Sequence, residues 1–257
     1  MGMKSFRLRR MEQYILEKDT VSMEELCREF AISMNTARLD VAQLVSKGTI
    51  KKVYGGVCSN RQNNLVPFEE RKSKNSDGKR SLCRAAAELV EDGDIIYIDS
   101  GTTTMYLVDF LENKKNVTVL THNLNAIMRA IPFPNLQIIC LPGTLDRRTN
   151  SFVAAETGRT LERYNIKKAF MAAAGIAANG DITNSSPLEF EVKRAAIENS
   201  NHVYLMADSS KYGKTSLLTY AHISDMEQIL INADVERAFV ELCAQNNVKL
   251  KLVEEEE

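Results

Sequence analysis

From residue 78 to the end of the chain, short apolar runs alternate with segments whose apolar residues recur every three or four positions. The short runs predict buried strands, and the longer segments predict helices. Strands joined by helices form a parallel sheet covered on both faces, so this region is predicted to be an α/β domain. The predicted strands are DIIYID, VTVL, LQIICL, KAFMAAA, HVYLMAD, SLLTYA, QILIN and VKLKLV, in chain order. The segments PGTLDRRTNSF and GIAANGDITNS are predicted to be loops.

The first of these strands runs into a glycine- and threonine-rich loop, DSGTTT. Its residues are Asp99, Ser100, Gly101, Thr102, Thr103 and Thr104, and the segment TTMYLVDFLEN that follows is predicted to be a helix. Glycine lets the backbone approach a ligand closely, and the first N–H groups of a helix bind anions. The pattern therefore predicts a site for a phosphorylated small molecule.

Other predicted strands end in similar turns. Polar or glycine residues follow the strands at residues 121–123, at Gly175 and at residues 208–211. Ligands of open α/β sheets lie at the carboxyl ends of the strands, so these turns are expected to lie beside the DSGTTT loop.

Residues 1–58 have a different pattern, which predicts three short helices and a hairpin. Ser22 is expected to cap the second helix, with Glu25 completing a capping box, and Ser33 is expected to cap the third. The segment TIKKVYGGV then predicts two strands joined by a glycine turn. This is the order of a winged helix-turn-helix, although a three-helix bundle used for protein contacts is the alternative.

Charge favours DNA as the partner of this N-terminal domain. Residues 1–61 hold 11 Lys and Arg against 7 Asp and Glu, while the remaining residues are net acidic. A basic head on an acidic body is typical of a nucleic-acid-binding domain attached to a domain that does not bind nucleic acid. The expected contacts with double-stranded operator DNA are Ser22, Ser33, Asn35, Thr36, Arg38, Lys51, Lys52 and Tyr54.

The domain boundaries follow from composition. We predict a DNA-binding domain at residues 1–58, a polar linker at 59–77 and an α/β domain at 78–257. No apolar run has the length of a membrane helix, and the N-terminus lacks the apolar core of a signal peptide. The five cysteines are odd in number and never spaced as C-x-x-C, which predicts a reducing cytoplasm, no metal site and no cofactor.

Several segments together resemble one family. SMEELCREFAISMNTARLDVAQLVSKGTIKKVYGGV, IDSGTTT, THN, LPGTLDRRTNSFV and ADSSKYGK, in this order, resemble the DeoR family of bacterial transcription regulators. The resemblance implies a sensor domain similar to the ribose-5-phosphate isomerase and coenzyme A transferase folds, with a phosphorylated sugar or related metabolite as effector. The family's recognition helix usually has two adjacent arginines, whereas this chain has Arg38 followed by Leu39.

The resemblance also implies roles in effector binding. Arg71, Lys79 and Lys211 would supply positive charge to a phosphate, with Arg71 at a position where the family more usually has a lysine. From their places at the strand ends, Asp99, Asn123 and Asp208 are expected to orient sugar hydroxyls. A single winged helix buries little surface on DNA, so a homo-oligomer, either a dimer or a tetramer, is expected to bind the operator. The sign of regulation, repression or activation, stays open, with repression preferred.

An enzyme is the principal alternative, because sugar-phosphate isomerases share the expected sensor fold. An isomerase needs a general base, for which Asp99, Asp181, Glu189 and Asp208 have the right chemistry. Glu189 is expected instead to form a capping box with Ser186, and Asp181 to lie in a turn after Gly180. A DNA-binding protein without a ligand would not need the DSGTTT loop. We therefore predict a sensor and not an enzyme.

Overall fold

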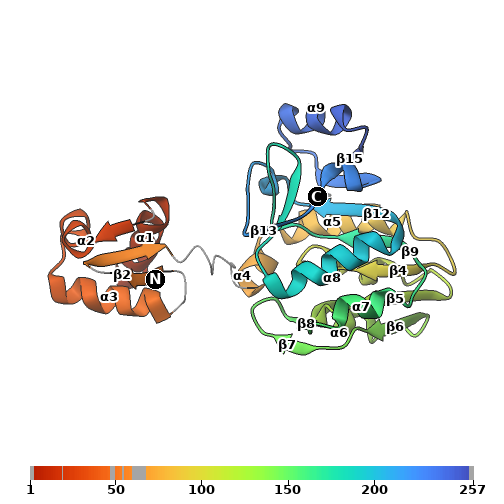
Figure 1. Ribbon diagram of the computed structural model, residues 1–257, viewed down its shortest axis with the longest axis horizontal. Helices are drawn as coiled ribbons and strands as arrows, with labels where there is room; N and C mark the ends of the chain where they lie inside the picture. The colour runs from red at the N-terminus through yellow and green to blue at the C-terminus, as the bar shows by residue number, and fades with distance from the viewer. Residues whose placement is uncertain (1–2, 19, 47–49, 54, 60–67, 255–257) are drawn as a thin grey trace. The chain divides into compact units, whose positions relative to one another are not determined.

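The computed structural model describes residues 3–18, 20–46, 50–53, 55–59 and 68–254. The chain divides into two compact units, residues 1–65 and 66–257, each of which is described by itself (Figure 1). Tyr54, an expected DNA contact, lies outside the described residues. Within the described parts, no helix combines the length and the apolar character that a membrane span requires.

The first unit is a winged helix-turn-helix. It contains α1 (Met3–Lys18), β1 (Thr20–Ser22), α2 (Met23–Phe30), α3 (Met34–Ser46), β2 (Ile50–Val53) and β3 (Gly56–Ser59). The helices pack around a core that includes Met11, Ile15, Leu26 and Leu44, all fully buried. The hairpin β2–β3 is extended by β1, which pairs antiparallel with β3. Strand β1 was not predicted, because three residues carry no local pattern and their partner lies far along the chain.

Two serines begin the helices of the helix-turn-helix as predicted. Ser22 Oγ accepts a hydrogen bond from Glu25 N at 3.1 Å, and Ser33 Oγ accepts one from Thr36 N at 3.2 Å. The expected capping box is not formed, because the Glu25 carboxylate accepts hydrogen bonds from Tyr14 and Lys18 and so connects α1 to α2. Each cap satisfies an N–H group that the helix itself leaves without a partner.

The second unit contains a seven-stranded parallel sheet, as the alternating pattern predicts. Its strand order is β15-β14-β12-β9-β4-β5-β6. The strands are β4 (Ile95–Ile98), β5 (Val117–Thr121), β6 (Leu136–Cys140), β9 (Ile166–Met171), β12 (Ser200–Ala207), β14 (Gln228–Asn232) and β15 (Lys249–Val253). Successive residues of a strand face opposite sides, so Ile96 and Ile98 of β4 enter one apolar core and Tyr97 enters the other.

Helices cover both faces of this sheet. One face packs against α5 (Ser76–Ala87), η2 (Thr104–Phe110) and α6 (Leu124–Ala130), and the other against α7 (Thr157–Leu161), α8 (Pro187–Glu198) and α9 (Arg237–Gln245). Because the strands are parallel, the carboxyl ends of β4, β5, β9 and β12 lie at one edge of the sheet. The predicted ligand loops begin at this edge.

The structure corrects five local predictions. The segment expected to be a helix after the DSGTTT loop is the 3₁₀ helix η2. The two expected loops form the hairpins β7 (Thr144–Asp146) with β8 (Ser151–Val153) and β10 (Gly175–Ile176) with β11 (Asp181–Asn184). Strand β13 (Leu218–His222) pairs with β11 in a small separate sheet and not in the main sheet. Helix α4 (Phe68–Ser73) and the start of α5 occupy part of the predicted linker.

One of these corrections follows from a distant partner. Asp181 begins β11 after the turn at Gly180, whose φ of +91° suits glycine, but β11 becomes a strand only through its distant partner β13. Segment η2 has the tighter 3₁₀ geometry, and its residues from Thr104 to Val108 are buried. Two short 3₁₀ helices, η3 (Ser209–Lys211) and η4 (Ile223–Asp225), complete the second unit.

Candidate functional site

The expected DNA contacts lie on two exposed surfaces of the first unit. Asn35 and Arg38 are exposed on α3, and Lys51 and Lys52 are exposed on β2, the first strand of the wing. Ser22 and Ser33 are exposed at the starts of their helices, where their hydroxyl oxygens are already used as caps. Thr36 is half-buried, and its hydroxyl shares a hydrogen bond with Ser33 Oγ at 2.9 Å.

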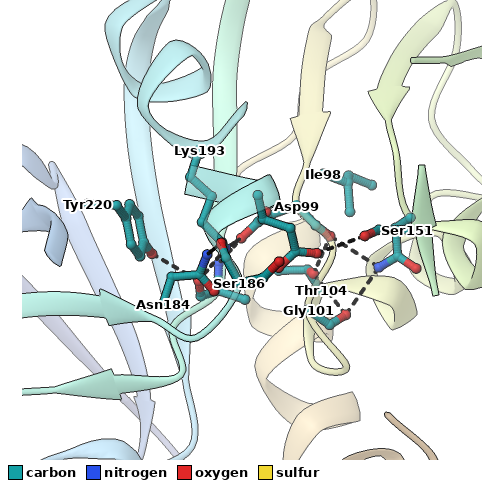
Figure 2. A network of polar contacts seen from close by, with 12 residues as sticks. Ile98, Asp99, Gly101, Thr104, Ser151, Asn184, Ser186, Lys193 and Tyr220 are labelled. Atoms are coloured by element: carbon teal, nitrogen blue, oxygen red, sulfur yellow. Dashed lines mark hydrogen bonds and ion pairs between the residues drawn. The ribbon is translucent and has the colours of Figure 1, made fainter. Parts of the chain in front are cut away.

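In the second unit, a buried ion pair lies at the carboxyl end of β4. The Asp99 carboxylate is fully buried; it accepts hydrogen bonds from Lys193 Nζ and from Ala172 N at 2.9 Å (Figure 2). Lys193, from α8, is 4% exposed and also donates to Ala172 O at 2.9 Å. Its ammonium lies 4.9 Å from the centre of the Tyr220 ring. Each charge is thus surrounded by groups of opposite sign or by a π face.

The surroundings keep Asp99 ionised. Burial acts to raise the pKa of the Asp99 carboxyl, but the charge of Lys193 and the hydrogen bonds outweigh it, and the pKa lies below its ordinary value. Burial raises the pKa of the neighbouring Tyr97 and Tyr220 hydroxyls well above 10, and the nearby carboxylates add to that shift. At neutral pH Asp99 is therefore a carboxylate next to neutral tyrosines.

Two residues that were expected to bind the effector hydrogen-bond to the backbone of the DSGTTT loop. The Asn123 amide donates to Asp99 O and to Gly101 O, both at 3.1 Å, and its oxygen caps α6. The Thr104 hydroxyl donates to Asp99 O at 2.7 Å. Asn123 and Thr104 thus shape the loop, and Asp99 is occupied by Lys193. Asn123, Thr104 and Asp99 were all predicted to bind the effector. The contacts that the structure gives them are with other residues of the protein.

Gly101 is required by its neighbour. A Cβ at this position would lie 2.3 Å from the Cβ of Ala172, so only glycine lets the loop lie against the end of β9. Glycine was expected here so that the backbone could approach a ligand. In the structure it also lets the DSGTTT loop approach Ala172. Ser100, Thr102 and Thr103 of the loop are buried. Gly175 lies so close to Lys214 O that a side chain would not fit there.

Glu189 does not form the expected capping box. Its carboxylate accepts a hydrogen bond from Ser151 Oγ at 2.8 Å, while Ser186 caps nothing with its side chain. Glu189 is 4% exposed, and its negative charge acts on Tyr97, Tyr220 and Arg71. A hydrogen bond to β8 across the chain has replaced the local cap, because Glu189 faces the interior.

Two buried polar atoms near this carboxylate have no hydrogen-bond partner among the described residues: His122 Nε2 and Ser186 Oγ. His122 Nδ1 is hydrogen-bonded with Tyr97 OH at 3.1 Å. Burial lowers the pKa of His122 and keeps the ring neutral at pH 7, against the opposing charges of nearby carboxylates. Unpaired buried polar atoms carry a desolvation cost, which a ligand hydroxyl at this position would offset.

A cluster of basic side chains lies at the carboxyl end of β12. Lys79 from α5 is 4% exposed, and its ammonium donates to the carbonyl oxygens of Arg71 and Lys74 at the end of α4. Asp208 accepts hydrogen bonds from Ser210 N at 2.9 Å and from Asn75 Nδ2 at 3.4 Å. Lys211 follows in η3.

The cations in this cluster lie close enough to affect one another. Burial lowers the pKa of Lys79 to about 8, with Asp208 opposing the shift and neighbouring cations, Lys211 first among them, adding to it. Burial likewise lowers the pKa of Lys211. Such a cluster is electrostatically unfavourable by itself and favours a bound anion.

The structure thus brings the predicted residues into two neighbouring groups. Arg71, Lys79, Asp208 and Lys211 form the basic cluster, and Asp99, Gly101, Thr104 and Asn123 form the loop network. Arg71 connects the groups, since the charge of Glu189 acts on its guanidinium. Sequence reasoning missed Lys193 and His122. The only local signal for Lys193 is its spacing of four residues after Glu189 on α8. The described residues contain no cluster of metal-ligating side chains.

Two family models match the chain. Residues 7–63 match the DeoR-like helix-turn-helix domain, and residues 74–233 match the DeoR C terminal sensor domain. The chain is 41% identical over 250 residues to the HTH-type transcriptional regulator IolR of Bacillus subtilis (strain 168), covering 97% of this chain and 100% of that protein. It is 26% identical over 240 residues to the glycerol-3-phosphate regulon repressor of Escherichia coli (strain K12), covering 93% and 95% of the two chains.

A solved structure of D-ribose-5-phosphate isomerase in complex with phospho-erythronic acid also resembles part of the chain. The TM-score is 0.40 at 14% sequence identity, covering 53% of this chain and 54% of that one. The two curated relatives are named as a transcription regulator and a repressor, and not as enzymes, as the sequence predicts.

We expect Lys193→Met to lower the free energy of unfolding by about 3–5 kcal/mol, because it leaves the Asp99 carboxylate buried without its cation. Urea unfolding at pH 7 measures the change. The control is Arg194→Ala, which removes an exposed pair with Glu198 and should cost no more than about 1 kcal/mol. A Lys193→Met protein as stable as the control would contradict the importance assigned to the buried pair.

Proposed function

Because the chain belongs to the DeoR family of bacterial transcription regulators, we propose that it represses a carbohydrate-metabolism operon and releases its operator when a phosphorylated sugar binds to the second unit. The observation that carries the effector part of this proposal is the basic cluster beside the strand ends, in which Lys79 is buried and Arg71 and Lys211 are half-buried. The family's transcriptional role supports operator DNA as the partner, with the protein acting as a dimer or tetramer in the cytoplasm.

DNA binding uses the exposed side chains of the first unit. Arg38 of α3 has the fork of donors that suits guanine in the major groove, and Asn35 lies one turn earlier on the same helix. Lys51 and Lys52 lie on the wing, where a cation meets the phosphate backbone. The serines at the helix starts supply additional phosphate contacts through their hydroxyl hydrogens.

The phosphate of the effector binds to the basic cluster. A dianionic phosphate placed among Arg71, Lys79 and Lys211 relieves the repulsion between these cations and compensates for the burial that lowers the pKa of Lys79 and Lys211. The backbone of the DSGTTT loop lies at the neighbouring strand end and supplies N–H donors.

The hydroxyl groups of the effector face the carboxylate side of the site. Glu189 is an acceptor there, and Ser186 Oγ and His122 Nε2 have hydrogen-bonding capacity that no described residue uses. The site has cations at one end and neutral or acidic hydrogen-bonding groups at the other. A ligand with an anionic end and a hydroxyl-bearing end matches this arrangement. A phosphorylated sugar or polyol has that distribution of charge.

Lys79 supplies a route from the effector to the DNA-binding unit. Its ammonium now holds the carbonyl oxygens at the end of α4, the first described helix after residues 60–67. A phosphate competes for the same ammonium, so the bound and free states differ in how α4 is held. An effector changes DNA affinity only through such a difference between two states.

For DNA binding, we expect Arg38→Ala to weaken operator affinity by about 1–3 kcal/mol, since it removes a paired contact with a base. Lys51→Ala and Lys52→Ala should weaken binding to all sequences alike and reduce its dependence on salt. Fluorescence anisotropy with operator and unrelated duplexes over a range of salt concentrations separates the two effects. An Arg38→Ala protein with wild-type affinity for the operator would refute the role of Arg38.

For the effector, matched phosphorylated and unphosphorylated sugars should separate in a thermal-shift assay, because a ligand that binds only the folded state raises the unfolding temperature. Lys79→Ala or Lys211→Ala should abolish the shift. Affinity should fall as the pH rises past about 8, where the Lys79 ammonium loses its proton and its attraction for phosphate. Lys79→Arg, which stays charged, serves as the control for this pH effect. Equal shifts from both members of every pair would argue against a phosphate site.

Deleting the gene should raise transcription of the operon it controls, because a repressor without effector blocks transcription. A reporter fused to the operon promoter measures the change, and complementation with the Arg38→Ala form should fail to restore repression. Lower reporter output in the deletion strain would identify an activator.

A further inference from the structure

The exposed residues of α3 lie on one face of the helix. They are Asn35, Arg38, Leu39, Ala42, Gln43 and Ser46, and at 3.6 residues per turn they fill an arc of about 140°. The opposite face buries Ala37, Asp40, Val41 and Leu44 in the core of the first unit. Leu39 lies near the middle of the exposed face and is 64% exposed.

The rest of this face has the chemistry of a surface that contacts DNA bases. Asn35, Arg38 and Gln43 carry the donors and acceptors that match adenine and guanine edges. The only carboxylate of α3, Asp40, is turned inward, where it is 1% exposed and accepts a hydrogen bond from Arg7 Nε at 2.7 Å. No acidic side chain of α3 therefore faces the phosphates of an approaching duplex.

A leucine in the middle of this face cannot hydrogen-bond to a base. The only apolar group that a base pair presents in the major groove is the C5-methyl group of thymine. The second helix of a helix-turn-helix is the one that enters this groove. We propose that Leu39 selects the operator sequence by packing against a thymine methyl group, an inference that rests on the DNA-binding role of the first unit.

This contact would make Leu39 a determinant of sequence and not of general affinity. Burying one methyl-sized group changes a binding constant by about fourfold. The effect is confined to one thymine in each half-site, beside the base pairs that Arg38 and Asn35 contact. It adds nothing to the attraction between lysines and phosphates.

The test uses the full-length protein and removes only the methyl group. An operator is selected from a pool of random-sequence duplexes with the wild-type protein, and each thymine in it is then replaced singly by deoxyuridine. Affinities for these duplexes are measured by fluorescence anisotropy for the wild type, for Leu39→Ala and for Leu252→Ala. Leu252 is 48% exposed on β15, so its substitution removes the same side chain from the other unit.

The expected result is one thymine in each half-site whose replacement by deoxyuridine weakens wild-type binding about fourfold. Leu39→Ala should abolish this difference, and Leu252→Ala should keep it. The inference is overturned if no methyl effect depends on residue 39. It is also overturned if Leu39→Ala changes only the oligomeric state in light scattering, which would make Leu39 a contact between copies. Failure to select any duplex would instead contradict the DNA-binding role.

Discussion

The ion pair between Lys193 and Asp99 holds together the parts from which the strand-end site is built. Asp99 ends β4, Lys193 comes from α8, and both are hydrogen-bonded to the backbone of Ala172 just after β9. Two charges can be buried only if their remaining hydrogen-bonding capacity is also satisfied, and Ala172 and the Tyr220 ring contribute to this. The pair therefore determines where the DSGTTT loop lies, and Gly101 is needed because the loop must then rest on Ala172.

The polar and charged groups around this pair are arranged unevenly. Glu189, His122 and Ser186 lie on the side of the loop network, whereas Lys79, Lys211 and Arg71 form a basic cluster whose pKa values are lowered by burial. A protein that only needed stability would gain little from gathering cations around a buried lysine. The cost of gathering these cations is offset if an anion joins them. Lys79 can respond to such an anion, because its ammonium donates to the carbonyl oxygens of Arg71 and Lys74, with which a phosphate would compete.

Much of the fold could be predicted from local patterns. The apolar runs gave the parallel strands, and Ser22 and Ser33 marked the starts of α2 and α3, because strand alternation and helix caps involve residues a few positions apart. Strands β1 and β11 escaped prediction for the opposite reason: β1 pairs with β3 and β11 pairs with β13, and both partners lie far along the chain. Segment η2 was mistaken for an α-helix because its apolar spacing is helical, and spacing over seven residues does not distinguish a 3₁₀ helix from an α-helix.

By itself the sequence determined the two kinds of domain, the family and the types of residue at the strand ends. The tertiary structure alone decided what those residues do. Asp99 was identified as a strand-end acid, but its partner Lys193 lies 94 residues further on. Glu189 had the spacing of a helix cap, yet it bonds to Ser151 because α8 turns it inward. Spacing along a chain specifies neighbours within one helix or strand, whereas the packing of separate elements sets which charges are buried together.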